Sequence, residues 1–311
     1  MHGLARQAIT DDMVITSGCI EAVSLCLQAV GPAGATVVVE SPTYPWFLQI
    51  IEDQTKFALE IPTHPQTGID LDQLNRALQK NAVAACLLVP NFHNPLGFAM
   101  PEEQKKALVK MMGEMNISII EDNIHGELYF GDARPTTLKS MDRKGLVLHC
   151  ASFSKTLSPG LRVGWALPGR FSDRVKRLKM NSTIASPTLN QQVVAQFLKT
   201  GAFDRHLRRL RSALRNQITN TALAIARTFP NGTRITAPQG GLTLWVELDK
   251  KVDGLKVFQE ARMKKISIFP GIICSTTGRY RNFIRISCGY PWSEQIEKGI
   301  KTLSRIIKKM I

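Results

Sequence analysis

The chain has 311 residues, of which 44% are hydrophobic, so it can bury one large core or two unequal ones, and a disordered protein is excluded. Its 40 basic and 25 acidic residues give a net charge of +15 at pH 7, which favours anionic ligands without indicating a fold. The six cysteines form no C-x-x-C pair, and neither a membrane-spanning apolar stretch nor a signal peptide occurs, so we expect no metal site, no disulfide framework, no membrane partner and a cytoplasmic location.

Short apolar runs alternate with stretches of helical spacing along the first two thirds of the chain. A short strand is predicted at residues 13–16 and a helix at 20–30. Further strands, apolar on both faces, are predicted at 35–39, 84–89, 117–120 and 146–150, and further helices at 71–79 and 102–115. Strands that are apolar on both faces are typical of a parallel sheet covered by helices. Residues 1–202 are therefore predicted to form a large, doubly wound α/β domain.

The pattern changes after about Gly201. A long helix is predicted at 203–228, followed by strands at 242–246, 266–269 and 283–286 and a last helix at 294–309. We interpret residues 203–311 as a smaller C-terminal α+β domain that the chain enters through the long helix.

Residues 152–165, S-F-S-K-T-L-S-P-G-L-R-V-G-W, are the most informative part of the sequence. Lys155 has neighbours that suit a lysine holding a cofactor aldehyde as an imine. Two small hydroxyls, Ser152 and Ser154, and the cation of Arg162 form the pattern of a phosphate clamp.

Polar residues follow two of the predicted strands. Asp122 lies at the carboxyl end of one, where open α/β sheets bind ligands, and its carboxylate could keep a heterocyclic nitrogen protonated; capping a turn or helix is the alternative. Asn94, in N-P-L-G, could donate to a ring oxygen, or could belong only to a turn.

Three weaker signals complete the set. The amides of Gly18, Cys19 and Ile20 stand at a predicted helix N-terminus and could bind phosphate, unless they form an ordinary turn. Tyr44 could stack on a flat ring or pack in the core. Arg285, a charge inside a predicted strand, needs a partner, which could be the carboxylate of a small substrate or an internal acid.

Taken together, the motifs resemble the fold type I, class I/II aminotransferase family of pyridoxal-phosphate (PLP) proteins, from Ile15 to the last helix. The resemblance implies pyridoxal 5'-phosphate as cofactor and Lys155 as the catalytic residue, which forms an internal aldimine and moves the substrate α-proton. Asp122 would pair with the pyridine nitrogen, Asn94 with the phenolic oxygen, and Tyr44 would stack on the ring. The residues implied to contact the cofactor are Gly18, Cys19, Ile20, Tyr44, Asn94, Asp122, His125, Ser152, Ser154, Lys155 and Arg162. Arg285, with Asn94 beside it, would bind the substrate carboxylate.

The sequence departs from the family pattern at two places. His125 stands where relatives usually carry a tyrosine that bonds the phenolic oxygen; imidazole can donate a similar bond, and a structural histidine is the alternative. The leading segment that relatives carry before Ser17-Gly18 is not found, so we expect a truncated protein, a fragmentary gene product or the trailing part of a fusion.

Residues 15–22 and 120–128 are similar to the aminotransferase-like half of MocR-type GntR regulators. That resemblance implies an effector domain that senses amino acids or the vitamin and need not turn over. It also implies a homodimer, and contact with DNA only through an N-terminal winged helix, of which this sequence contains no pattern. The arginines at 205, 208, 209, 211 and 215 could face DNA, or could lie on a solvated or interdomain face. The alternative functions are a free-standing aminotransferase, which converts amino acids to keto acids, and a folded remnant without cofactor.

Overall fold

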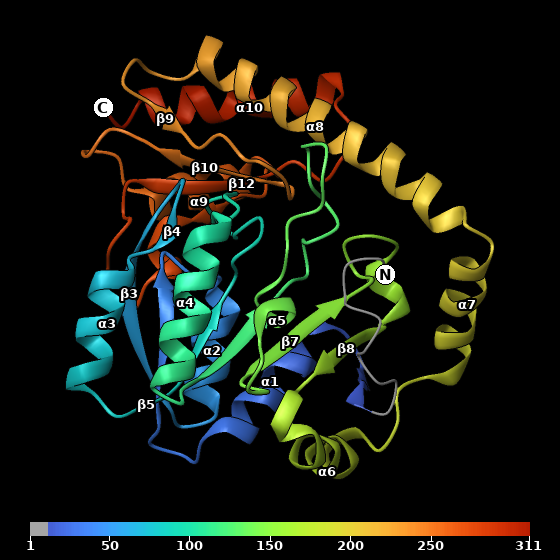
Figure 1. Cartoon of the computed structure of the whole chain (residues 1–311). Coiled ribbons are helices and arrows are strands. Elements are labelled where there is room, and N and C mark those ends of the chain that lie inside the picture. The colour runs from blue at the N-terminus through green and yellow to red at the C-terminus, as the bar shows by residue number, and fades with distance from the viewer. Residues whose placement is uncertain (1–11) are drawn as a thin grey trace.

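The computed structural model describes residues 12–311 and contains two β-sheets surrounded by helices (Figure 1). The start of the chain, where a leading segment was expected to be missing, includes residues outside this range. The larger sheet has the strand order β1-β8-β7-β6-β5-β2-β3-β4. Its strands are β1 (Val14–Thr16), β2 (Thr36–Ser41), β3 (Phe57–His64), β4 (Gly68–Ile69), β5 (Val83–Leu88), β6 (Ser118–Asp122), β7 (Val147–Ser152) and β8 (Gly164–Leu167).

The central strands of this sheet are parallel. Strands β3, β2, β5, β6 and β7 pair in parallel, whereas β8 runs antiparallel to both of its neighbours, β7 and β1. The doubly wound, mainly parallel sheet expected from the apolar runs is therefore confirmed.

Helices cover both faces of the large sheet because successive side chains of each strand point to opposite faces. On β2, Val37 and Val39 pack into one core, and Val38 packs into the other. The first core includes residues of α1 (Cys19–Val30), α2 (Pro45–Asp53) and α6 (Ser172–Thr183). The second includes residues of α3 (Leu71–Lys80), α4 (Glu102–Glu114) and α5 (Leu138–Met141).

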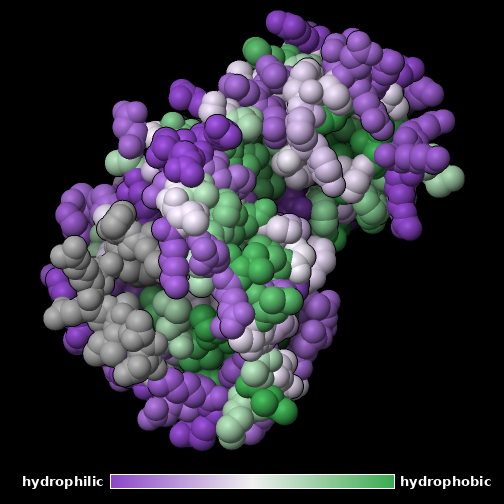
Figure 2. Space-filling model, turned by 90° about the vertical axis from the view of Figure 1, so that its right-hand side faces the viewer, coloured by the Kyte–Doolittle hydropathy of each residue, from purple (hydrophilic) through white to green (hydrophobic). Residues whose placement is uncertain are grey.

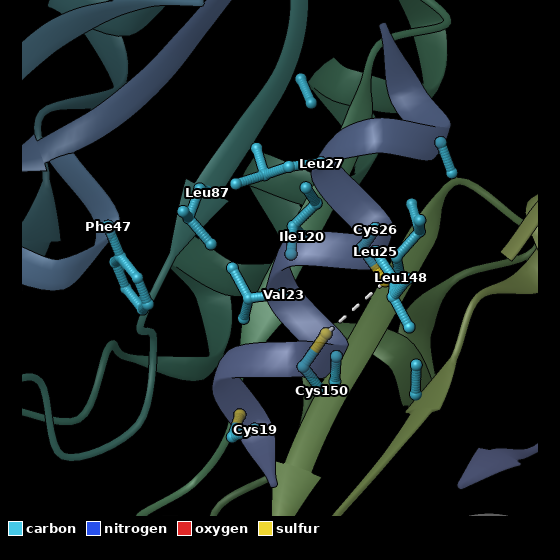
Figure 3. Packing of buried hydrophobic residues seen from close by; sticks show 14 of the residues in the cluster. Cys19, Val23, Leu25, Cys26, Leu27, Phe47, Leu87, Ile120, Leu148 and Cys150 are labelled. Atoms are coloured by element: carbon cyan, nitrogen blue, oxygen red, sulfur yellow. Dashed lines mark hydrogen bonds between the residues drawn. The ribbon is translucent and has the colours of Figure 1, made fainter. Parts of the chain in front are cut away.

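Helix α1 contributes many of the buried residues of the first core (Figure 3). Its Cys26 lies against Cys150 of β7, with 3.7 Å between the two sulfur atoms. All six cysteines fall within the described range, and each is buried and free. In residues 12–311 no cluster of metal-binding side chains and no helix long and apolar enough to cross a membrane is found.

The smaller sheet is antiparallel and lies above the large one in Figure 1. Its order is β11-β12-β10-β9, with strands β9 (Arg234–Ile235), β10 (Thr243–Glu247), β11 (Phe269–Pro270) and β12 (Phe283–Ser287). Its core is shared with α9 (Gly254–Met263), α10 (Glu294–Lys308) and the second half of α8 (Ala202–Thr228). The first half of α8 packs instead with α7 (Thr188–Lys199). Short 3-10 helices lie at η2 (Pro159–Leu161), η3 (Gly169–Phe171) and η4 (Gly271–Cys274).

One predicted strand is largely wrong, and four strands, β3, β4, β8 and β9, were not predicted. The stretch 266–269 pairs only from Phe269, because Ile266 to Ile268 connects α9 to the sheet without pairing. Strand β3 lies near the edge of the large sheet with most of its residues partly exposed, so it shows no continuous apolar run.

The two sheets are tied together by Glu60 of β3. Its carboxylate accepts hydrogen bonds from the Ser41 hydroxyl (2.6 Å), the Ser275 hydroxyl (2.7 Å) and the Thr276 hydroxyl (2.7 Å). Burial raises the pKa of Glu60, but these hydrogen bonds outweigh it and the pKa is lowered. This Glu60 bridge holds the segment after η4 against β2 and β3.

The arginine cluster divides into two kinds of environment. Arg211 donates to the Glu127 carbonyl (2.8 Å) and lies 3.7 Å above the Tyr129 ring, so it ties α8 to the segment after β6. The other four arginines of the cluster, Arg205, Arg208, Arg209 and Arg215, are exposed.

Candidate functional site

The predicted site residues gather at the carboxyl ends of the large-sheet strands. Gly18 follows β1, Tyr44 follows β2, Asn94 follows β5, Asp122 ends β6, and Lys155 follows β7. Carboxyl ends of parallel strands meet at one edge of the sheet, which is where open α/β folds bind ligands. Tertiary folding therefore brings together residues that the sequence holds far apart.

These residues surround a cavity of about 240 Å³. Ten of the twelve predicted site residues line it: Cys19, Ile20, Tyr44, Asn94, Asp122, His125, Ser154, Lys155, Arg162 and Arg285. The other two, Gly18 and Ser152, support it from behind; the Ser152 hydroxyl accepts a hydrogen bond from the Ser154 amide (3.3 Å). A larger groove of about 680 Å³ beside α7 has no charged side chain among its described lining residues, so it lacks groups for acid–base chemistry.

Lys155 presents an amine to the cavity. Its side chain is exposed there, and no described carboxylate forms an ion pair with it. Desolvation by the surrounding protein and then the Arg285 cation lower the pKa of Lys155, although Asp122 acts in the opposite direction. A lower pKa raises the fraction of neutral amine, which is the form that attacks an aldehyde carbon.

Asp122 is a buried carboxylate without a cationic partner in the described range. It is 5% exposed, and its Oδ1 accepts hydrogen bonds from the Ile124 amide (2.8 Å) and the Cys19 thiol (3.3 Å). Burial raises the pKa of Asp122 to about 6, even though these two hydrogen bonds act against the rise. A carboxylate in this condition suits a protonated ring nitrogen, which would relieve the cost of burying its charge.

Arg285 of β12 meets Asn94 across the cavity. Its Nη1 donates to Asn94 Oδ1 (2.9 Å), and its guanidinium lies 4.1 Å above the Phe269 ring. Its Nε is buried and has no partner among residues 12–311. Among the side chains described there, no acid pairs with Arg285, so the internal acid proposed as an alternative partner is not found, and a donor is left for an external carboxylate.

The turn between β1 and α1 has the features of an anion-binding turn, and we call it the anion cradle. Helix α1 begins at Cys19 with no side chain capping its first amides, so these point toward the cavity with the positive end of the helix dipole. Arg162 donates to the Ser17 carbonyl, which holds its guanidinium against the turn. Gly18 has φ of 109°, and a Cβ there would lie 2.6 Å from Arg162 Nη2, so only glycine allows this approach.

Tyr44 both lines the ligand cavity and packs against other aromatic side chains, which are the two alternatives expected for it. Its ring lines the cavity and also stacks on Trp46, with 5.5 Å between ring centroids. It is therefore held rigidly in a position from which it can cover a bound ring.

His125 is buried and neutral. Its Nδ1 lies 3.2 Å from the Phe92 carbonyl oxygen, and burial lowers the pKa of His125 to about 3, with Lys155 contributing. A carbonyl oxygen only accepts, so Nδ1 carries the single proton and Nε2 is an acceptor. The expected donation from this imidazole to a phenolic oxygen therefore does not fit the neutral ring.

Sequence patterns missed three lining residues that come from the small sheet. Leu242 precedes β10, and Thr243 of β10 pairs directly with Ser287 of β12. They reach the cavity only because the small sheet packs over the large one, and no local pattern near them indicates a site.

The arrangement fits a flat, phosphorylated aldehyde that carries a basic ring nitrogen. Lys155 would hold the aldehyde, Asp122 the ring nitrogen, and Arg162 with the α1 amides the phosphate. The unpartnered buried Nε of Arg285 is left for a second, carboxylate-bearing ligand.

Comparison with known proteins agrees with this fit. A family model described as aminotransferase class I and II matches residues 4–303. The HTH-type transcriptional regulators YjiR and YdcR of Escherichia coli K12, both described as uncharacterized, are 39% and 38% identical to this chain. Their alignments cover 96% and 99% of this chain but only 63% and 66% of the regulators, so the chain spans slightly under two thirds of their length.

Catalytic relatives and solved structures match as well. The 2-aminoadipate transaminase of Thermus thermophilus is 31% identical over 97% of this chain and 76% of its own length. The crystal structure of LysN, the α-aminoadipate aminotransferase of that organism, complexed with N-(5'-phosphopyridoxyl)-L-leucine, superposes with a TM-score of 0.91 over 96% of this chain and 78% of that one.

These matches confirm the expected family, the fold type I architecture and pyridoxal 5'-phosphate as cofactor, and they confirm the resemblance to HTH-type regulators. The division into domains at residue 202 and the roles of single site residues stay predictions. The chain belongs to the class I and II aminotransferase family.

Proposed function

We propose that this chain binds PLP through Lys155 and serves as the amino-acid-sensing effector domain of a MocR-type transcriptional regulator. The observation that carries the proposal is the cavity that joins an unpaired lysine amine, the buried Asp122 carboxylate and the anion cradle. The higher identity to two HTH-type regulators than to the transaminase supports the regulatory setting.

Bound in this cavity, PLP supplies an aldehyde for amino groups and a ring that takes up electrons from the substrate α-carbon. Lys155 would hold the aldehyde carbon and would move the proton at the substrate α-carbon. Asp122 keeps a proton on the ring nitrogen. Asn94 donates to the ring oxygen, and Tyr44 covers one face of the ring.

The remaining residues orient the two ligands. Ser154 and Arg162 bind the phosphate together with the amides at the start of α1, and Ser152 holds the Ser154 amide in place. Arg285 binds the substrate carboxylate, and its bond to Asn94 links the carboxylate site to the ring site.

Cofactor binding is tested by borohydride reduction of the PLP-loaded chain followed by peptide mass mapping. The added mass is expected on Lys155, and Lys155→Ala is expected to lose it together with the visible absorbance. Lys176→Ala, which changes an exposed lysine on α6, is the matched control and should keep both. If the Lys155 peptide carries no added mass, the hypothesis that remains is a folded remnant that does not bind the cofactor.

A free-standing aminotransferase is the second candidate, favoured by the complete set of Asn94, Asp122, Lys155, Arg162 and Arg285 around one cavity. Mixing the loaded chain with amino acids and an acceptor keto acid distinguishes the two functions. A sensor changes its absorbance and releases less than one keto acid per site, whereas an enzyme turns over repeatedly. The upstream reading frame is the second test, because an ordinary aminotransferase leading arm there contradicts the regulator.

We further propose a homodimer formed through the face that carries α7. This face displays apolar side chains in Figure 2, and Ile184, Leu189 and Val193 are 82%, 71% and 51% exposed. The double substitution Leu189→Lys and Val193→Lys is expected to give a monomer in light scattering, while Leu223→Lys on α8 leaves the mass unchanged. A dimer that survives the double substitution contradicts this surface.

Three smaller proposals concern location, domain boundary and DNA contact. The six reduced cysteines support a cytoplasmic location. The domain boundary is proposed at residue 202, where α8 begins. The preceding Gly201 has a left-handed backbone conformation, with φ of 65°, and lies between α7 and α8. DNA contact is proposed only through a winged helix of the full regulator.

A further inference from the structure

The charged groups that line the cavity are few, and each has a place in the proposed function. They are Asp122, Lys155, Arg162 and Arg285, because His125 is neutral. Asp122 serves the ring nitrogen, Lys155 the aldehyde and Arg162 the phosphate. Arg285 is then the one described cation left for substrate, and it matches a single α-carboxylate.

The rest of the described lining carries no charge. It consists of Val89, Ile124, Pro159, Leu242, Thr243 and Ser287, together with the side chain of Ile20. Four of the six are hydrocarbon, and the two hydroxyls are neutral.

Strand register places part of this uncharged wall next to the carboxylate site. Thr243 lies directly opposite Ser287, and Arg285 stands two residues before Ser287 on the same strand. Alternate residues of a strand share a face, so Arg285, Ser287 and Thr243 lie on one face of the small sheet. Leu242 precedes Thr243 and is partly exposed at the cavity.

We propose that the site selects amino acids with a neutral, mainly apolar side chain and rejects those with a charged one; this rests on the proposed function. A carboxylate in the side chain of the amino acid would lose its water without gaining a cationic partner, because Arg285 already pairs with the α-carboxylate. A basic side chain would meet the cations of Arg162 and Arg285 and only one carboxylate of the protein, Asp122, which the ring nitrogen occupies. Neutral chains of the same length instead gain contact with Leu242 and Ile20.

The proposal makes a dicarboxylic amino acid an informative probe. The Thermus thermophilus protein is named for 2-aminoadipate, an amino acid with two carboxylates. The neutral wall of this chain predicts that 2-aminoadipate is a poorer ligand here than an apolar amino acid of the same chain length.

An isosteric series tests the selection on the PLP-loaded chain. L-norleucine, L-2-aminoadipate and L-lysine have the same number of chain carbons and differ at the side-chain end, where they carry a methyl group, a carboxylate and an ammonium. The concentration of each that gives half of the maximal absorbance change is measured at one pH and ionic strength. We expect the value for norleucine to be at least about tenfold lower than the other two. Equal values, the reverse order or no response to norleucine overturns the inference.

A charge placed in the wall is the second test. Leu242→Arg is expected to lower the half-maximal concentration for 2-aminoadipate relative to norleucine by about tenfold or more. Leu255→Arg on α9 adds the same charge at an exposed leucine outside the cavity and should leave the ratio unchanged. An unchanged ratio in Leu242→Arg contradicts the wall as a selector. If the unaltered chain gives no PLP absorbance at all, the proposed function fails first; PLP binding with the wrong order of amino acids removes this inference alone.

Discussion

Asp122→Asn should stabilise the cofactor-free chain at neutral pH, although it removes a residue of the proposed site. Burial raises the pKa of Asp122 from 3.8 to about 6, so the folded state holds the proton more tightly than the unfolded state does. Stability is therefore lost as the pH rises from about 4 to about 6 and stays lower above that range. Asparagine does not titrate, so the variant escapes this loss.

The magnitude follows from the size of the shift. A rise of about two pKa units, at about 1.4 kcal/mol each, amounts to about 3 kcal/mol once both states are ionised. At pH 5 the carboxyl of Asp122 is ionised in the unfolded state and mostly protonated in the folded state, so the loss of stability at this pH is only about 1.6 kcal/mol. The advantage of Asp122→Asn should thus grow by about 1.4 kcal/mol between pH 5 and pH 7.5.

Urea unfolding of the cofactor-free chain at these two pH values measures the effect. The growth with pH is diagnostic, because any constant change in the bonds to Ile124 and Cys19 cancels in the difference. Glu52→Gln, at an exposed carboxylate on α2, is the control and should show no such growth. A free-energy difference for Asp122→Asn that stays constant with pH would refute the reasoning. In the same variant PLP should bind at least about tenfold more weakly, because a neutral amide cannot pair with a protonated ring nitrogen.

Three further predictions concern single positions. Gly164→Ala should cost about 1–3 kcal/mol in urea unfolding and weaken PLP binding, since its Cβ would lie 2.6 Å from the Gly18 backbone; Gly299→Ala, with open space around it, should not destabilise the fold. Glu60→Gln should cost about 1–2 kcal/mol at pH 7, and the cost should shrink as the pH falls through the lowered pKa of Glu60, because the glutamate is then itself protonated; a pH-independent cost would show that the charge is not what matters. His125→Gln should leave the pH dependence of the PLP absorbance unchanged between about pH 5.5 and 8, because the pKa of His125 is about 3, and a shifted midpoint would contradict a neutral imidazole.

Sequence patterns predicted the buried parts of the fold well. Strands β2, β5, β6 and β7 are buried on both faces, so their continuous apolar runs are visible without a structure. Strand β3 near the sheet edge is partly exposed and gave no such run. The stretch 266–269 is apolar, but only Phe269 pairs with a neighbouring strand. An apolar run shows that a segment is buried and does not show that another strand lies beside it.

By itself the sequence determined which chemical groups follow which strands, since motifs such as the run around Lys155 are local and parallel strands must end at one edge. Only the tertiary structure decided what those groups touch. Arg285 donates a hydrogen bond to Asn94 rather than to an acid, and His125 donates one from Nδ1 to the Phe92 carbonyl oxygen. Leu242 lines a cavity that is built mostly by residues of the large sheet. These contacts join residues widely separated along the chain, and their partners are set by how the small sheet packs over the large one, which no local pattern of residues encodes.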